Sequence, residues 1–187
     1  MISDEQILEE LLNPKKLLII GKTGSGKTRL INRILKHIEN QPDTIYLFIT
    51  HDLVNHTGEN SYGHINAERF KIDWLADNPA LSIGLAVLFR NTAIEFPSCD
   101  LPMNHAKHHV LKTVLRLLFD ASHSQKKRLI LITDDVSDAV NEVIYALSND
   151  DKCIITATNI KNIIDKFQKL EPEGILSIQR FNQLHLD

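Results

Sequence analysis

The feature that most constrains this chain is a glycine-rich turn, GKTGSGKT at residues 21–28, set between an apolar run and an amphipathic segment. The run LLII at 17–20 has the uninterrupted apolar character of a strand buried on both faces of a parallel sheet. After the turn, apolar residues between positions 30 and 38 recur with helical spacing. A buried strand, a glycine turn and a helix in this order predict a phosphate-binding loop.

The residue types in the turn suit a polyphosphate ligand. Three glycines let the backbone curl so that consecutive N–H groups point inward at a β-phosphate, and the helix beginning near Lys27 adds the positive end of its dipole. Lys27 can reach β- and γ-phosphate oxygens, and the Thr28 hydroxyl can bind Mg²⁺. The predicted nucleotide-binding residues are Gly21, Lys22, Thr23, Gly24, Ser25, Gly26, Lys27, Thr28 and Arg29.

The nucleotide expected at this loop is ATP, bound with Mg²⁺. A GTPase would carry an Asn/Thr-Lys-x-Asp motif, in which the aspartate pairs with the guanine edge. The nearest string, TNIKN at 158–162, lacks that aspartate. No positive signature for adenine is visible, so the preference for ATP depends on this missing motif.

A pair of aspartates follows the apolar run 129–132, in LILITDDVSD. Asp134 is expected to hold Mg²⁺, usually through a water, and Asp135 to orient and deprotonate an attacking water. Aspartate has one methylene less reach than the glutamate that many hydrolases place at the second position. The alternative is that both acids cap the helix that follows, because Asp is common at helix starts.

The segment CIITATN at 153–159 ends another apolar run with polar residues. Asn159 or Thr158 is expected to face the γ-phosphate and the attacking water, and so to report whether the phosphate is present. The alternative is that Asn159 caps the amphipathic segment that follows, a position that asparagine favours.

Apolar runs and helical stripes alternate along the chain and predict an α/β fold of a single domain over residues 1–187. We expect a doubly wound, mostly parallel sheet of five or more strands, with helices on both faces. An insertion or elaboration is expected within about 52–126. Strands are expected at 17–20, 45–50, 127–133, 152–158 and 174–181, helices at 3–12, 27–38, 80–90, 106–119, 137–148 and 159–170, a short strand at 92–96 and a loop at 56–64.

Charge and cysteine content narrow the functional classes. The formal net charge of −3 argues against a general nucleic-acid clamp, although a local basic groove remains open. Cys99 and Cys153 are too few for a disulfide framework and suit a reducing compartment. Because no apolar run approaches the length of a bilayer span, we expect a cytoplasmic chain without a membrane span.

Taken together, GKTGSGKT, LILITDD, IITATN and a final ILSIQRF run resemble the P-loop NTPases with an additional strand in the core. This group includes the AAA+ proteins, the superfamily 3 helicases, and the type II/IV secretion and pilus-retraction ATPases, which the chain resembles most. In such enzymes an extra strand lies between the phosphate-loop strand and the acidic strand. Two departures stand out: Asp134-Asp135 replaces the usual Gly-Glu, and Asn159 replaces a histidine box.

The resemblance implies an ATPase that works as a ring, either a homo-oligomer or a subunit of a larger machine, with a macromolecular cargo. His51-Asp52 partly matches the aspartate box of the secretion ATPases. By the same likeness a neighbouring subunit supplies an arginine, for which the candidates are Arg90, Arg116, Arg128 and Arg180.

Two other functions stay open at this point. A small-molecule or nucleotide kinase would suit the chain length, but it usually needs an arginine-bearing lid that the sequence does not display. A regulatory or structural subunit could bind nucleotide without hydrolysing it.

Among weaker signals, three histidines are interpreted mainly as surface residues rather than a zinc site: His105, His108 and His109. Trp74 is interpreted mainly as a packing residue rather than one that stacks on a base.

Overall fold

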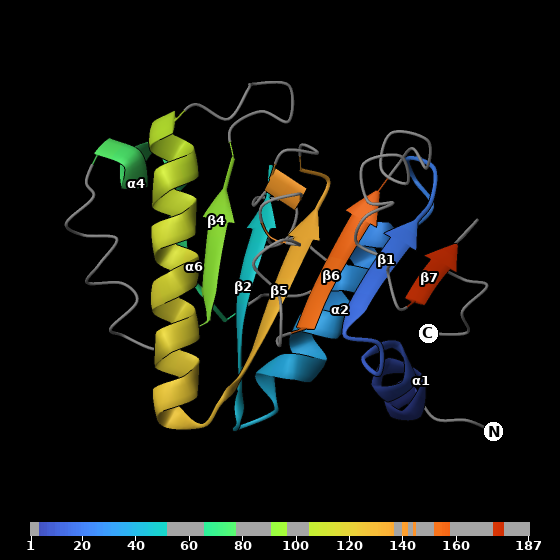
Figure 1. Cartoon of the computed structure of the whole chain (residues 1–187). Coiled ribbons are helices and arrows are strands. Elements are labelled where there is room, and N and C mark those ends of the chain that lie inside the picture. Colours follow the sequence, from blue (N-terminus) through green and yellow to red (C-terminus); the bar gives the residue numbers. More distant parts are fainter. Residues whose placement is uncertain are drawn as a thin grey trace.

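The computed structural model of the chain describes residues 4–51, 66–77, 91–96, 105–136, 140–141, 144, 152–157 and 174–177. Helices and strands alternate through these segments (Figure 1). In chain order the elements are α1 (Asp4–Leu11), β1 (Lys16–Ile20), α2 (Lys27–Glu39), β2 (Thr44–Thr50), β3 (Glu68–Lys71), α4 (Ile72–Asp77), β4 (Thr92–Glu95), α6 (His105–Gln125), β5 (Arg128–Asp134), β6 (Lys152–Ala157) and β7 (Gly174–Ser177).

Within the described segments, the strands form one seven-stranded sheet in the order β3-β4-β2-β5-β6-β1-β7. Every pairing between neighbours is parallel, so the carboxyl ends of all the strands lie at one edge of the sheet. The α/β class and the parallel sheet are therefore confirmed. The part of the sheet that the structure describes has seven strands, which agrees with the expectation of five or more.

Two apolar cores, one on each face of the sheet, hold the layers together. Along β1, Leu17 and Ile19 belong to the core that α1 and α2 cover, whereas Leu18 and Ile20 belong to the core that α4 and α6 cover. Figure 1 shows α2 behind the sheet, while α6 lies on the other face. Because both faces are covered, the strands need continuous apolar runs, an arrangement compatible with a doubly wound fold.

Most expected elements lie where the apolar patterns put them. The five expected strands correspond to β1, β2, β5, β6 and β7, and the expected short strand at 92–96 corresponds to β4. The short elements β3 and α4 were not expected. Residues 140, 141 and 144 are helical, within the helix expected at 137–148. The expected helices at 80–90 and 159–170 and the loop at 56–64 lie outside the described residues.

No helix in the described part of the chain is both long and apolar enough to cross a membrane.

Candidate phosphate and metal site

Two glycines in left-handed conformations shape the loop between β1 and α2. Gly24 has a φ of 78°, and Gly26, which caps the start of α2, has a φ of 97°. A Cβ atom built on Gly24 would meet nothing within 4 Å, so it is the backbone conformation, rather than crowding, that favours glycine there. The loop therefore turns sharply and leaves open space around its tip.

Lys27 folds back across this loop. Its side chain is 7% exposed, and Nζ donates to the carbonyl oxygens of Gly21 at 2.8 Å and Lys22 at 3.3 Å. Both partners are neutral, and an ammonium has three protons to donate. Because these two partners are neutral, the buried cation is a good partner for an anion that enters the loop.

Ser25 adds a buried hydroxyl to the loop. The residue is 4% exposed, and its Oγ has no hydrogen-bond partner in the described part of the chain. A buried hydroxyl without a partner costs about 1–3 kcal/mol, and a phosphate oxygen would accept its proton. Of the other predicted loop residues, Thr28 and Arg29 are half-buried at the start of α2, and Lys22 and Thr23 are exposed.

Asp134 is the last residue of β5 and is only 2% exposed. Its Oδ1 accepts a hydrogen bond of 2.7 Å from the hydroxyl of Thr156 on β6. The same hydroxyl accepts a hydrogen bond of 3.0 Å from the backbone N–H of Asp135. Thr156 therefore joins the ends of β5 and β6 directly at the acidic pair.

Asp135 differs from Asp134 in its backbone conformation and in the exposure of its side chain. It lies just beyond β5 with a φ of 53°, in the left-handed region that few non-glycine residues adopt, and its side chain is 57% exposed. Its Oδ2 lies 3.9 Å from Nε2 of His51, the residue after β2. Nδ1 of His51 is buried and has no partner among the described residues.

A second polar network braces the turn that contains the acidic pair. The Thr133 hydroxyl donates to Oδ1 of Asn141 at 2.7 Å, and Nδ2 of Asn141 donates to the carbonyl oxygen of Val136 at 3.4 Å. Thr133 and Asn141 are both buried. Sequence reasoning missed this pair, although Asn141 interrupts an apolar helical stripe that includes Val140 and Ile144.

The sheet topology brings these groups to one edge. β6 lies between β1 and β5. Thr156 of β6 is paired with Ile19 of β1, and Ile155 of β6 is paired with Thr133 of β5. On the other side of β5 lies β2, and the last residues of these two strands, Thr50 and Asp134, are paired. The backbone N–H of Gly21 also bonds to the Ala157 carbonyl oxygen at 3.1 Å, which continues the pairing of β1 and β6 into the loop. Asp134, Asp135 and Thr156 thus lie at the carboxyl ends of β5 and β6, and the Lys27 amine bonds to Gly21, directly after the neighbouring strand β1.

Several predicted residues fall outside this edge or outside the described residues. Thr158 and Asn159, together with Arg90 and Arg180, lie outside the described residues. Arg116 is exposed on α6, and Arg128 is exposed at the first residue of β5, at the far end of that strand from Asp134. Neither Arg116 nor Arg128 belongs to the glycine loop or to the strand ends that carry the acidic pair.

The weaker signals of the sequence belong to other elements than the glycine loop and the acidic pair. His105, His108 and His109 occupy the first turns of α6, and the described residues contain no group of three or more His, Cys, Asp or Glu side chains that could hold a metal ion. Trp74 stacks on Phe70, with ring centroids 6.0 Å apart, and stays 44% exposed. It is therefore packed against one ring but not enclosed.

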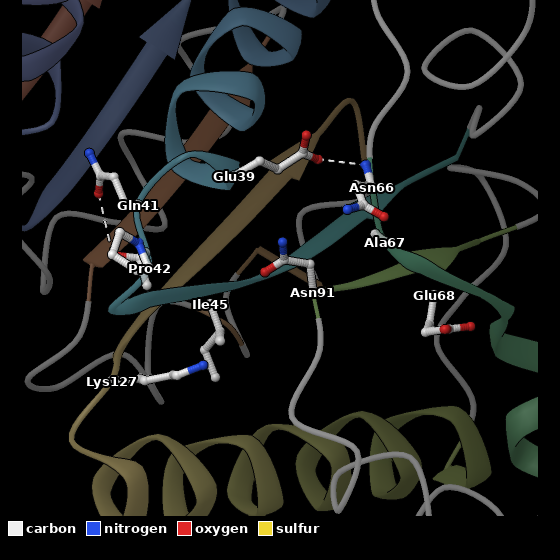
Figure 2. A pocket seen from close by; sticks show the side chains of 10 residues that line it. Glu39, Gln41, Pro42, Ile45, Asn66, Ala67, Glu68, Asn91 and Lys127 are labelled. Atoms are coloured by element: carbon white, nitrogen blue, oxygen red, sulfur yellow. Dashed lines mark hydrogen bonds between the residues drawn. The ribbon is translucent and has the colours of Figure 1, made fainter.

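A polar pocket of about 440 Å³ lies at the opposite end of the sheet (Figure 2). There Glu39 Oε1 accepts hydrogen bonds from the Tyr46 hydroxyl at 2.7 Å and from the Asn66 N–H at 2.6 Å. Burial raises the pKa of Tyr46 well above its ordinary value, and the hydrogen bond and negative charge of Glu39 raise it further. The pocket is lined by Glu39, Gln41, Pro42, Thr44, Ile45, Asn66, Ala67, Glu68, Asn91 and Lys127.

Comparison with known proteins adds no assignment, because no protein-family model matches the sequence and no curated protein matches it.

Proposed function

We propose that this chain is a Mg²⁺-dependent module that binds and hydrolyses ATP and works within an oligomer or a larger assembly. Turnover would be coupled to the movement or assembly of a macromolecule. The observation that most supports the proposal is the placement of two groups at one sheet edge. The Lys27 amine folds over the glycine loop after β1, and the buried Asp134 carboxylate ends β5, with only β6 between them.

The loop residues fit the polyphosphate of a nucleotide. Lys27 supplies positive charge, the start of α2 supplies backbone N–H groups, and Ser25 supplies a buried hydroxyl without a partner among the described residues. These groups are donors, as a polyanion requires. The preference for ATP over GTP comes from the missing guanine-reading motif alone.

Thr28 and Asp134 fit a magnesium ion, which prefers hard oxygen ligands and keeps several waters. The Thr28 hydroxyl would bind the ion directly, and Asp134 would hold one of its waters. When bound, Mg²⁺ neutralises charge on the phosphates as the terminal phosphoryl group is transferred. Asp134 would stay fixed through this step because it is buried and bonded to Thr156.

Asp135 would orient the attacking water and accept its proton. Its carboxylate is exposed, and the ring of His51 lies beside it. Asn159 would contact the terminal phosphate and the same water.

A second function, nucleotide binding with little turnover, is favoured by the observations on Asp135. The side chain is shorter than the glutamate usual at this place, and its Oδ2 faces His51 at 3.9 Å. A module of this kind would use nucleotide occupancy to regulate or stabilise an assembly.

The test measures ATP binding and steady-state phosphate release for the wild type, Lys27→Ala and Asp135→Asn. We expect wild-type turnover, loss of binding in Lys27→Ala, and retained binding with turnover reduced about 100-fold or more in Asp135→Asn. Binding without turnover in every variant that binds would favour the regulatory function. Phosphate transferred to an acceptor other than water would indicate a kinase, and a wild type that does not bind nucleotide would refute the proposal.

A further inference from the structure

Thr156 contacts both members of the acidic pair although it belongs to a different strand. Its hydroxyl donates to Oδ1 of Asp134 at 2.7 Å and accepts from the N–H of Asp135 at 3.0 Å. The side chain is buried in β6, where water does not compete for these bonds. Sequence reasoning assigned the polar end of this strand to phosphate sensing and gave Thr156 no part of its own.

The two hydrogen bonds use the hydroxyl in different ways. A backbone N–H can only donate, so the hydroxyl acts as the acceptor toward Asp135. Toward Asp134 the hydroxyl donates its one proton, and Oδ1 accepts it. This bond restricts the rotation of the Asp134 carboxylate group.

The bond to the Asp135 N–H has a second consequence. Asp135 has a φ of 53°, a conformation that persists in a non-glycine residue only where surrounding contacts hold it. Thr156 is one such contact, because its hydroxyl bonds the amide of this residue. One side chain thus governs both the carboxylate of Asp134 and the backbone from which the Asp135 side chain extends.

We propose that Thr156 is a positioning residue of this site. It orients the Asp134 carboxylate for magnesium and holds the backbone of Asp135, the group that would orient the attacking water. In this role it acts through the two aspartates rather than by touching nucleotide or metal. The inference rests on the proposed function, because it concerns the same metal and the same reaction.

The first experiment uses two substitutions with opposite expectations. Thr156→Val keeps the volume and the branched shape but removes the hydroxyl, whereas Thr156→Ser keeps the hydroxyl. At fixed ATP, the Mg²⁺ concentration that gives half-maximal nucleotide binding and half-maximal phosphate release should rise about tenfold or more in Thr156→Val. Thr156→Ser should lie within about threefold of the wild type.

The second experiment needs neither nucleotide nor metal. Amide hydrogen exchange, measured by NMR on the chain alone, should be about tenfold faster or more at Asp135 in Thr156→Val, because the amide loses its acceptor. Thr156→Ser should restore slow exchange. The matched control is Thr92→Val, which removes a buried threonine hydroxyl at the start of β4, at the other end of the sheet. It should affect thermal stability without changing the Mg²⁺ requirement.

The outcomes separate the two proposals. If the wild type binds or hydrolyses ATP and folded Thr156→Val has the same Mg²⁺ requirement, the inference is wrong and the proposed function stands. The inference is also wrong if Thr156→Val lowers stability as Thr92→Val does and changes neither the Mg²⁺ requirement nor exchange at Asp135. If the wild type shows no nucleotide binding and no turnover, both proposals are refuted.

Discussion

At the scale of single residues, the glycine loop between β1 and α2 depends on left-handed backbone conformations, which glycine adopts more readily than other residues. Gly24 has a φ of 78°, yet the space around its missing Cβ is open. A substitution there would change the conformational energy of the loop and create no clash. The loss of stability caused by a side chain at this position therefore measures directly the free-energy cost of the left-handed conformation.

We predict that Gly24→Ala lowers the free energy of unfolding by about 1–2 kcal/mol, the usual cost of a left-handed conformation for an L-residue. Gly24→Asn should cost less, because asparagine adopts this conformation more readily than alanine. Guanidinium unfolding followed by circular dichroism would measure both differences. Equal stability of wild type and Gly24→Ala would mean that the loop does not hold this conformation in solution.

The sequence predicted the loop residues but not the side-chain contacts around the acidic pair. The spacing of Gly21, Gly26, Lys27 and Thr28 is local and can be read directly. The bonds of Thr156 depend on the register of β5 against β6, two strands separated by residues 135–151. No local pattern encodes that register, so which hydroxyl meets which carboxylate became visible only in the folded chain.

At the scale of elements, β6 is tied to the end of α1 by a buried lysine. Lys152 is the first residue of β6 and is 1% exposed. Its Nζ donates to the carbonyl oxygens of Leu12 and Pro14, directly after α1. A buried ammonium is tolerated here because it satisfies carbonyl groups that the end of the helix leaves over.

We predict that Lys152→Met lowers the free energy of unfolding by about 1–3 kcal/mol, because the buried carbonyl of Leu12 and the partly buried carbonyl of Pro14 lose this donor. Amide exchange in α1 should accelerate more than exchange in β5. Lys15→Met, at an exposed position of the same turn, is the control and should change stability by about 0.5 kcal/mol or less. Similar losses in the two variants would contradict a specific role for Lys152.

Elements with apolar patterns were predictable, and those without them were not. The runs that became β1, β2, β5 and β6 are buried at almost every position, so periodicity alone located them. β3 has the sequence ERFK, lies at the edge of the sheet and is mostly exposed, which gives no apolar signal. The order of strands was not readable from periodicity either; only the family resemblance implied a strand between β1 and β5.

At the scale of the whole molecule, the proposal of an oligomer implies that a neighbouring chain adds an arginine to the site. Arg116 and Arg128, the candidates within the described residues, are exposed, and Arg128 lies at the opposite end of β5 from Asp134. We predict that phosphate release per chain rises with protein concentration over about a hundredfold range, because association follows mass action. Sedimentation velocity at the same concentrations would show whether larger species accompany the rise.

A mixing experiment supplies the control for this prediction. Lys27→Ala chains should be inactive themselves, yet they keep every arginine. Added to dilute wild type, they should increase phosphate release per wild-type chain. A rate per chain that is constant with concentration, and unaffected by the added variant, would indicate that each chain completes its own site.

The position of β6 also constrains how the chain can be made. β1 and β5 both emerge from the ribosome before β6, yet they end up as its two neighbours and never touch each other in the sheet. Until residues 152–157 have been synthesised, each of these strands has an edge whose N–H and C=O groups await the missing partner. If β1 paired too early with β5 or with another nascent chain, β6 could no longer pair with both of its neighbours. Stalled translation products ending before this strand should therefore depend on chaperones to a degree that the finished protein does not.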